Sequence, residues 1–119
     1  MEQRGEVEDR EFFSEDIVLD LDLKILSEKD LEDIISVFEE SIRTSIDRSI
    51  LRPLINAYAI ETSIQAGEKL VLRAYIEIYH RKDISREIVL KLIDEALERG
   101  YRDAESIIRR FSKRNRERT

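Results

Sequence analysis

Few side chains in this sequence have types and spacings that could do chemistry. The clearest pair is Asp20 and Asp22, which alternate with apolar residues and therefore share one face of a predicted strand. Paired carboxylates can bind a cation or act as acid and base, but no histidine or further ligand lies near them in the sequence. We interpret the pair as part of a solvated strand face and predict no metal site at it.

His80 is the only histidine, and it ends a predicted strand just before Arg81 and Lys82. A catalytic histidine works with a nucleophile or a second ligand, and the chain has no cysteine and no serine in a recognisable nucleophile motif. Gly-rich phosphate loops and HExxH motifs are also absent from the sequence. We therefore expect His80 to make local hydrogen bonds, and we expect neither a cofactor nor a stand-alone enzyme.

A first candidate surface for binding a macromolecule consists of Val71, Tyr75 and Tyr79, which fall on one face of a predicted strand. Tyrosine has a large apolar ring and a polar tip, and it suits surfaces that become buried in protein contacts. The sequence leaves two interpretations open. The three residues meet a partner protein, or long Arg and Glu stems cover them in the monomer.

A second candidate surface is the basic C-terminus, where the side chains that could contact phosphates are Arg109, Arg110, Lys113, Arg114, Arg116 and Arg118. Some of them could simply complement the negative end of a helix dipole. The first sixteen residues have the opposite sign, with two arginines against seven acids, and the chain as a whole has a net charge of −6. This overall balance argues against non-specific nucleic-acid binding by the body of the protein.

Apolar periodicity predicts the elements that position these residues. Residues 17–25 alternate as a half-buried strand whose inward side chains are Ile17, Leu19, Leu21, Leu23 and Ile25. Ser27 and Asp30 form a helix start, and an apolar stripe at three- and four-residue steps extends to about Asp47. Because the residue before a proline avoids helical angles, Arg52 should lie outside this helix.

The second half of the chain reads as a hairpin followed by a helix. Residues 55–79 contain two runs of β-type residues joined by a short connection at Gly67. The last helix begins after Asp83 or Ser85. It either passes through Gly100 or turns there into a second helix. We favour one helix, because the apolar stripe continues in phase beyond Gly100.

Together these elements predict an α+β fold with the order β-α-β-β-α. The expected sheet has three antiparallel strands in the order 1-3-2, with both helices on one face. We predict a flexible acidic tail over residues 1–14, a single domain over residues 15–112 and a basic tail over residues 113–119. So small a sheet leaves one face and two edges exposed, which favours dimerisation.

Composition limits the class of protein. Hydrophobic residues make up 41% of the chain and charged residues 40%, and no stretch approaches the ~20 apolar residues of a membrane span. The N-terminal residues are charged and lack the apolar core that a signal peptide needs, so we expect a cytoplasmic protein. Abundant Glu and Arg, with three Gly and one Pro, favour a thermophilic source.

Three segments carry a resemblance to a family: LSEKDLEDIISVFEESI, AIETSIQAGEKLVLRAYIEIY and VLKLIDEALERGYRDAESIIRR. Over roughly residues 17–112 the chain resembles a family of small uncharacterised archaeal proteins. Its element order is similar to that of the small dimerising subunit of the KEOPS complex and of the archaeal paralog of that subunit. KEOPS makes the threonylcarbamoyl modification on the adenosine beside the tRNA anticodon.

The resemblance implies a non-catalytic accessory subunit. Such a subunit would form a homodimer, or a heterodimer with a related small subunit, through sheet surfaces, while its helices dock on a catalytic partner in a larger complex. Neither tail of this chain maps onto the family, so tRNA contact would be indirect. The alternative is a small nucleic-acid-binding dimer that uses the Arg-rich C-terminal end.

Overall fold

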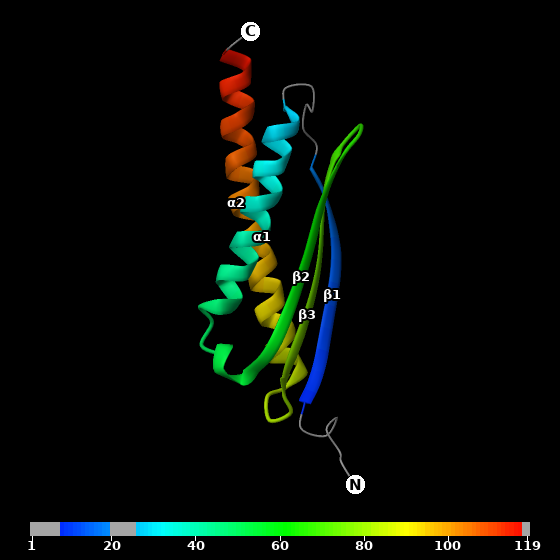
Figure 1. Ribbon diagram of the computed structural model, residues 1–119, viewed down its shortest axis with the longest axis vertical. Helices are drawn as coiled ribbons and strands as arrows, with labels where there is room; N and C mark the ends of the chain where they lie inside the picture. The colour runs from blue at the N-terminus through cyan, green and yellow to red at the C-terminus, as the bar shows by residue number, and fades with distance from the viewer. Residues whose placement is uncertain (1–7, 20–25, 118–119) are drawn as a thin grey trace.

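The computed structural model describes residues 8–19 and 26–117. Its elements, in chain order, are β1 (Glu8–Leu19), α1 (Glu28–Asp47), a 3₁₀ turn (Arg52–Leu54), β2 (Ile55–Ala66), β3 (Leu70–Arg81) and α2 (Arg86–Glu117). The strands form one antiparallel sheet in the order β1-β3-β2, and both helices lie against the same face of it (Figure 1). The predicted α+β fold, element order and strand order are confirmed.

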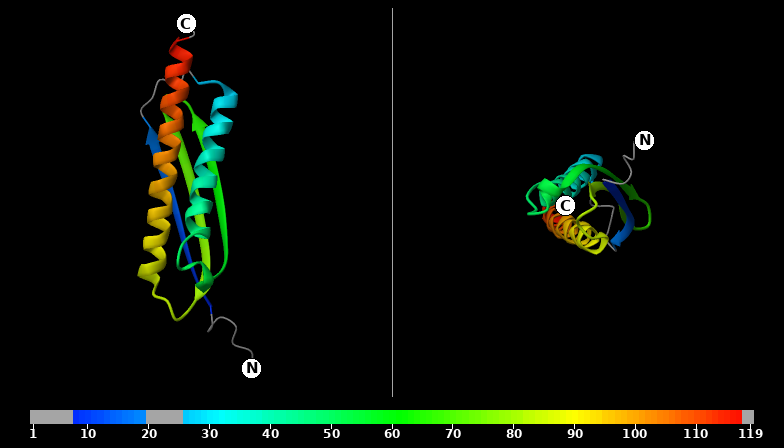
Figure 2. Two further views of the ribbon diagram at one scale, coloured as in Figure 1. Left: turned by 90° about the vertical axis from the view of Figure 1, so that its left-hand side faces the viewer. Right: turned by 90° about the horizontal axis from the view of Figure 1, so that it is seen from below.

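The core lies between the sheet and the two helices. Figure 2 shows these two layers of the backbone from two further directions. Successive side chains of a strand point to opposite faces, so alternate residues of the central strand β3 face the helices. These inward residues are buried: Leu70, Leu72, Ala74, Ile76 and Ile78. They pack against apolar stripes on the helices, formed by Ile34, Phe38, Ile42 and Ile46 on α1 and by Val89, Ile93, Leu97, Ala104 and Ile108 on α2.

α1 begins at the predicted capping box. The Asp30 backbone N–H donates to Ser27 Oγ at 3.0 Å, and the Ser27 backbone N–H donates to Asp30 Oδ2 at 3.1 Å. Two backbone groups that lack helical partners are thereby satisfied. The helix ends at Asp47, and Arg52 lies outside it, as predicted, in the 3₁₀ turn that contains Pro53.

α2 is continuous through Gly100, as the phase of its apolar stripe predicted. Glycine is required there because α1 packs against the α2 backbone. A Cβ atom on Gly100 would lie 2.9 Å from Ile42 Cγ1 and 3.1 Å from the Phe38 ring. Next to this contact the Tyr101 ring stacks on Phe38 with centroids 5.4 Å apart, and the Tyr101 hydroxyl donates to Glu15 Oε2 at 2.9 Å. One turn of α2 thus contacts both α1 and β1.

The predicted start of the first strand is wrong. β1 begins at Glu8, so residues 8–14 form a strand instead of the predicted flexible tail. Its inward positions include Glu11 and Glu15, and this polarity hid the strand from a search for apolar alternation. Their carboxylates accept hydrogen bonds from Arg86 and Tyr101 of α2. The predicted phase is confirmed for Ile17 and Leu19 by the β1–β3 register, while Leu21, Leu23 and Ile25, together with Asp20 and Asp22, lie outside the described residues.

The predicted basic tail over residues 113–119 is also wrong in part, because α2 extends to Glu117. The cluster of Arg and Lys near its end complements the negative end of the helix dipole, which favours continued helix. Arg116 therefore lies within α2, and Arg118 lies outside the described residues.

The contact at Gly100 predicts a stability effect. Gly100→Ala should lower the free energy of unfolding by up to about 2 kcal/mol. The added methyl group overpacks the α1–α2 contact at a cost of about 1–3 kcal/mol, and Ala in a helix interior offsets about 1 kcal/mol of that cost. Urea denaturation measures the effect. Gly67→Ala is the matched control, since a Cβ at Gly67 meets no atom within 4 Å, and equal stability of the two variants would contradict the packing argument.

Candidate functional site

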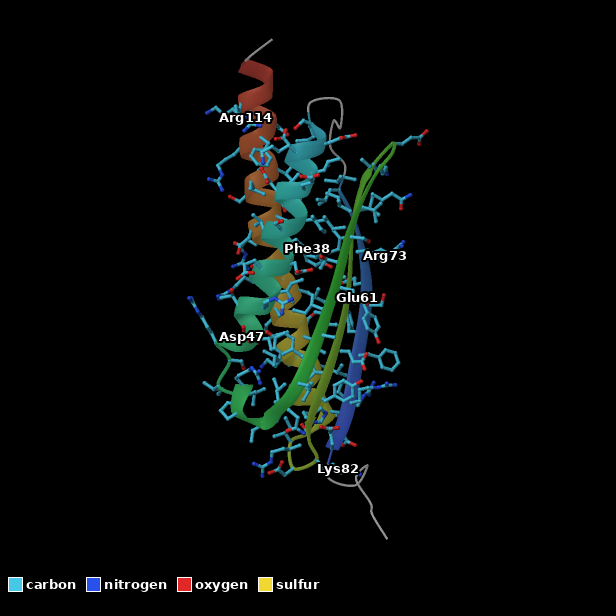
Figure 3. All side chains as sticks on the ribbon, viewed as in Figure 1. Phe38, Asp47, Glu61, Arg73, Lys82 and Arg114 are labelled. Carbon is cyan, nitrogen blue, oxygen red and sulfur yellow. The ribbon has the colours of Figure 1, made fainter. Side chains whose placement is uncertain are left out.

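The candidate site is the face of the sheet opposite the helices, which we call the outer face. Its residues are the outward-pointing side chains of the three strands: Glu8, Arg10, Phe12, Ser14, Asp16 and Val18 of β1, Val71, Arg73, Tyr75, Glu77, Tyr79 and Arg81 of β3, and Ala57, Ala59, Glu61, Ser63 and Gln65 of β2. Figure 3 shows Arg73 projecting on the side of the sheet away from the helices, with Phe38 between the helices and the sheet. No described element of the chain covers this face (Figure 1).

The centre of the outer face is a carboxylate held by two tyrosines. The Tyr75 hydroxyl donates to Glu77 Oε2 at 3.0 Å, and the Tyr79 hydroxyl donates to Glu77 Oε1. The hydrogen bond from Tyr79, and after it the one from Tyr75, hold the pKa of Glu77 below its ordinary value. The Arg10 guanidinium acts in the same direction and lies 3.5 Å from Glu77 Oε1. The three sequence candidates Val71, Tyr75 and Tyr79 therefore do share one face, and the two tyrosines act on the same group.

An exposed aromatic ring lies beside this cluster. Phe12 is 59% exposed, and its ring stacks loosely on Tyr75 with centroids 6.4 Å apart. The Arg10 guanidinium lies 5.6 Å from the centroid of the Phe12 ring. The sequence patterns did not identify Phe12, Arg10 or Glu77 as part of a site. The signals that could have found them are the outward phase that Arg10 and Phe12 share with Val18, itself 55% exposed, and the phase that Glu77 shares with Tyr75 and Tyr79.

A second ion pair lies along the outer face. Arg73 Nε and Nη2 donate to the two Asp16 oxygens at 2.7 Å and 3.0 Å, and the two residues are direct cross-strand neighbours. The guanidinium holds the pKa of Asp16 below its ordinary value. Both side chains are about half exposed, so solvent screens the pair and it adds little to stability. Its larger effect is to neutralise two charges on the outer face.

His80 lies on the opposite, inner face and is fully buried. Because a carbonyl oxygen only accepts, His80 Nδ1 donates to the Arg81 carbonyl oxygen at 2.8 Å. His80 Nε2 lies 3.0 Å from Glu11 Oε2, and Arg86 Nε donates to Glu11 Oε1 at 3.1 Å. The predicted local hydrogen bond is confirmed. The bridge to Glu11 was missed, because its partners are far apart in the sequence. This cluster joins β3, β1 and α2.

The basic residues of α2 do not form one free patch. Arg109 Nη2 donates to Glu105 Oε1 at 2.5 Å, and Arg114 Nη2 donates to Asp30 Oδ1 at 2.8 Å. The Arg114 guanidinium also lies 4.7 Å from the Phe111 ring centroid. Arg110 and Lys113 are exposed. Two of the four basic side chains described here are therefore engaged within the chain.

The helix side of the molecule has a shallow groove between α1 and α2, lined among others by Ser41, Thr44, Arg48, Arg99 and Asp103. Ser41 Oγ donates to Asp103 Oδ2 across it at 2.7 Å. This hydrogen bond links α1 to α2. Over residues 8–19 and 26–117, no group of three or more His, Cys, Asp or Glu side chains could hold a metal ion. In the same residues, no helix is long and apolar enough to span a membrane.

Comparison with known proteins informs the fold alone. No family model matches the chain, and no curated protein matches it. A crystal structure from Thermococcus onnurineus NA1 is similar, with a TM-score of 0.68 and 24% sequence identity. The match covers 89% of this chain and 98% of the other. The two chains therefore share the fold over nearly their whole lengths.

The Glu77 cluster predicts a pH effect. Because the folded state lowers the pKa of Glu77, this group's contribution to stability is present above its unfolded pKa and is lost as the pH falls through the lower folded value. Replacing both donors, by Tyr75→Phe and Tyr79→Phe, should move the Glu77 titration up toward its ordinary range. Carboxyl-carbon NMR measures it directly.

The control for this titration is Tyr58→Phe, since the Tyr58 hydroxyl bonds Asp47, at the end of α1, instead of Glu77. It should leave the Glu77 titration unchanged. If the double variant titrates like the unaltered chain, the two hydroxyls do not bind Glu77 in solution.

Proposed function

We propose that this chain is a non-catalytic protein-interaction subunit that pairs with another protein through the outer face of its sheet. The observation that carries the proposal is the outer face itself. Three twelve-residue strands present it, both helices lie on the other side, and its centre is a cluster of aromatic and Arg side chains. Aromatic residues and Arg are enriched in the cores of protein interfaces.

The electrostatics of the outer face support burial against a protein. Burying an unpaired charge is costly, whereas a charge that is already paired and hydrogen-bonded loses less on desolvation. Glu77 accepts hydrogen bonds from two tyrosines and forms an ion pair with Arg10. Asp16 accepts two hydrogen bonds from Arg73. A partner can therefore cover these groups without leaving them uncompensated.

The resemblance of the sequence extends the proposal to a partner class. We infer an accessory or regulatory role in the KEOPS tRNA-modification complex, in the cytoplasm of a thermophilic archaeon, with a related small subunit or a second copy on the outer face. In this arrangement the α1–α2 groove stays free for a catalytic partner. The nearly fully exposed Ile50, at 93%, lies at the end of that groove.

The alternative, a nucleic-acid-binding module, has weaker support. It depends on the basic end of α2, where Arg109 and Arg114 already contact acidic groups of the chain. Arg110 and Lys113 are the exposed residues left to contact phosphates among those described. Two cations give a small electrostatic footprint compared with that of a typical nucleic-acid-binding surface.

The first test of the proposal changes the centre of the outer face. Tyr75→Asp should dissociate the paired form, because it places an uncompensated charge beside Glu77 in the interface. We expect the affinity to fall at least about tenfold with the fold intact. Light scattering of the chain alone, and after mixing with the small KEOPS subunit, measures pairing, and circular dichroism checks folding.

Ile88→Asp is the matched control for that test. It makes the same kind of change at an exposed apolar residue of α2, away from the sheet. Pairing should be unaffected. A chain that remains a monomer alone and in the mixture would refute the interaction-subunit proposal.

A second test separates the two functions. In the double variant Arg110→Glu and Lys113→Glu we expect unchanged pairing, because neither residue lies on the outer face. RNA affinity measured at two salt concentrations should be weak before and after the change. Tight RNA binding that disappears in the variant, with a flatter salt dependence, would favour the nucleic-acid module instead.

A further inference from the structure

Large and small side chains are distributed unevenly over the outer face, and the strand register fixes where each lies. Large side chains gather on β1 and β3, where Phe12, Tyr75 and Tyr79 form a ridge. On β2 the outward residues Ala57, Ala59 and Ser63 are small and exposed, while Glu61 and Gln65 of the same face are larger. We call Phe12, Tyr75 and Tyr79 the ridge, and Ala57 with Ala59 the trough.

The register also fixes which ridge residue shares a row with which trough residue. Phe12 lies opposite Glu77, and Glu77 lies opposite Ala59, so the three residues form one row across the sheet. In the next rows, Ser14 aligns through Tyr75 with Glu61, and Arg10 aligns through Tyr79 with Ala57.

Symmetry then limits how two copies can stack face to face. Closed dimers have a two-fold axis, and each residue meets the same surface on the other copy. An axis parallel to the strands places β1 of each copy over β2 of the other and moves no residue along the strand. Phe12 therefore lands on its own row, over Ala59 of the partner subunit. Phe12 of each copy thus fills the trough of the other, while Tyr75 and Tyr79 lie along the axis and face β3 of the partner subunit.

The other simple axis, across the strands, fits less well. It would place ridge on ridge and trough on trough, with aromatic rings opposed on one side and alanines opposed on the other. Packed sheets lie about 10 Å apart, and side chains must fill that space to interior density. Both axes place β3 over β3, but only the axis parallel to the strands pairs the large Phe12 of β1 with the small Ala59 of β2.

Charge and area agree with a second copy as the occupant. With this axis, β3 lies over β3 and the two Glu77 carboxylates face each other, and their repulsion is reduced because each has its own Arg10 3.5 Å away and both tyrosine donors. Three twelve-residue strands cover about 14 Å by about 40 Å, which is about 600 Å² on each copy. Together the two copies bury about 1,200 Å², the lower end for a specific interface.

We propose that the occupant of the outer face is a second copy of this chain, stacked about a two-fold axis parallel to the strands, with Phe12 of each copy seated over Ala57 and Ala59 of the other. This inference rests on the proposed function and goes beyond it, because it names the partner and the register. Phe12→Ala should therefore weaken the dimer at least about tenfold.

Cross-linking between copies tests the register directly, since the chain has no cysteine of its own. One preparation has Ser14→Cys and the other has Glu61→Cys, positions that share a row and leave Phe12 and the alanines intact. A short bifunctional maleimide is added to the mixture and to each preparation alone. Mixing separate chains excludes a link within one chain.

We expect a covalent dimer in the mixture and none from either preparation alone. The link should be lost when Gln65→Cys replaces Glu61→Cys, because Gln65 lies four residues further along β2, about 14 Å away. A light-scattering dimer that links only in the Ser14→Cys preparation would overturn this axis while leaving the proposed function intact. A chain that stays a monomer without links, but pairs with the small KEOPS subunit, would overturn the second copy as occupant.

Discussion

The antiparallel register between β1 and β3 is the constraint on which both faces of the sheet depend. Side chains alternate between faces, so a shift by one residue would exchange every inward and outward residue of β1. Phe12 would enter the core and Phe13 would leave it. Contacts on both faces hold the observed register: Arg73 binds Asp16 on the outer face, and His80 contacts Glu11 on the inner face.

The inner contacts of β1 also connect the sheet to α2. Glu11 and Glu15 point toward the helices, where a bare carboxylate would lose its hydration at considerable cost. Arg86 and Tyr101 of α2 offset that cost with hydrogen bonds at 3.1 Å and 2.9 Å. Hydrogen bonds to charged groups are directional, so they fix where β1 lies along α2 more narrowly than apolar contacts would. The position of Phe12 on the outer face is therefore set by contacts on the inner face.

Local periodicity predicted most of the fold, because the elements that it describes bury apolar residues at regular steps. The hairpin, both helices and the continuity of α2 through Gly100 followed from such patterns. The N-terminal half of β1 did not, because its inward positions hold Glu11 and Glu15. Their partners lie 69 to 86 residues away, and only the tertiary structure brings them together. The candidate site likewise has a part that local alternation predicted and a part that it missed. The alternation of β3 predicted Val71, Tyr75 and Tyr79, whereas Arg10 and Phe12 were missed with their strand.

The cations of the outer face are of the kind that the proposed pairing requires. Among its described residues there is no lysine, although the chain has lysines elsewhere, and its cations are arginines. Lysine is strongly hydrated and depleted at interfaces, whereas the planar guanidinium of arginine loses hydration more readily, binds carboxylates with two hydrogen bonds and stacks on rings. Arg73 on Asp16 and Arg10 over Phe12 show both behaviours. Both contacts keep a guanidinium paired when water is removed, and this is the property by which the face would tolerate the proposed pairing.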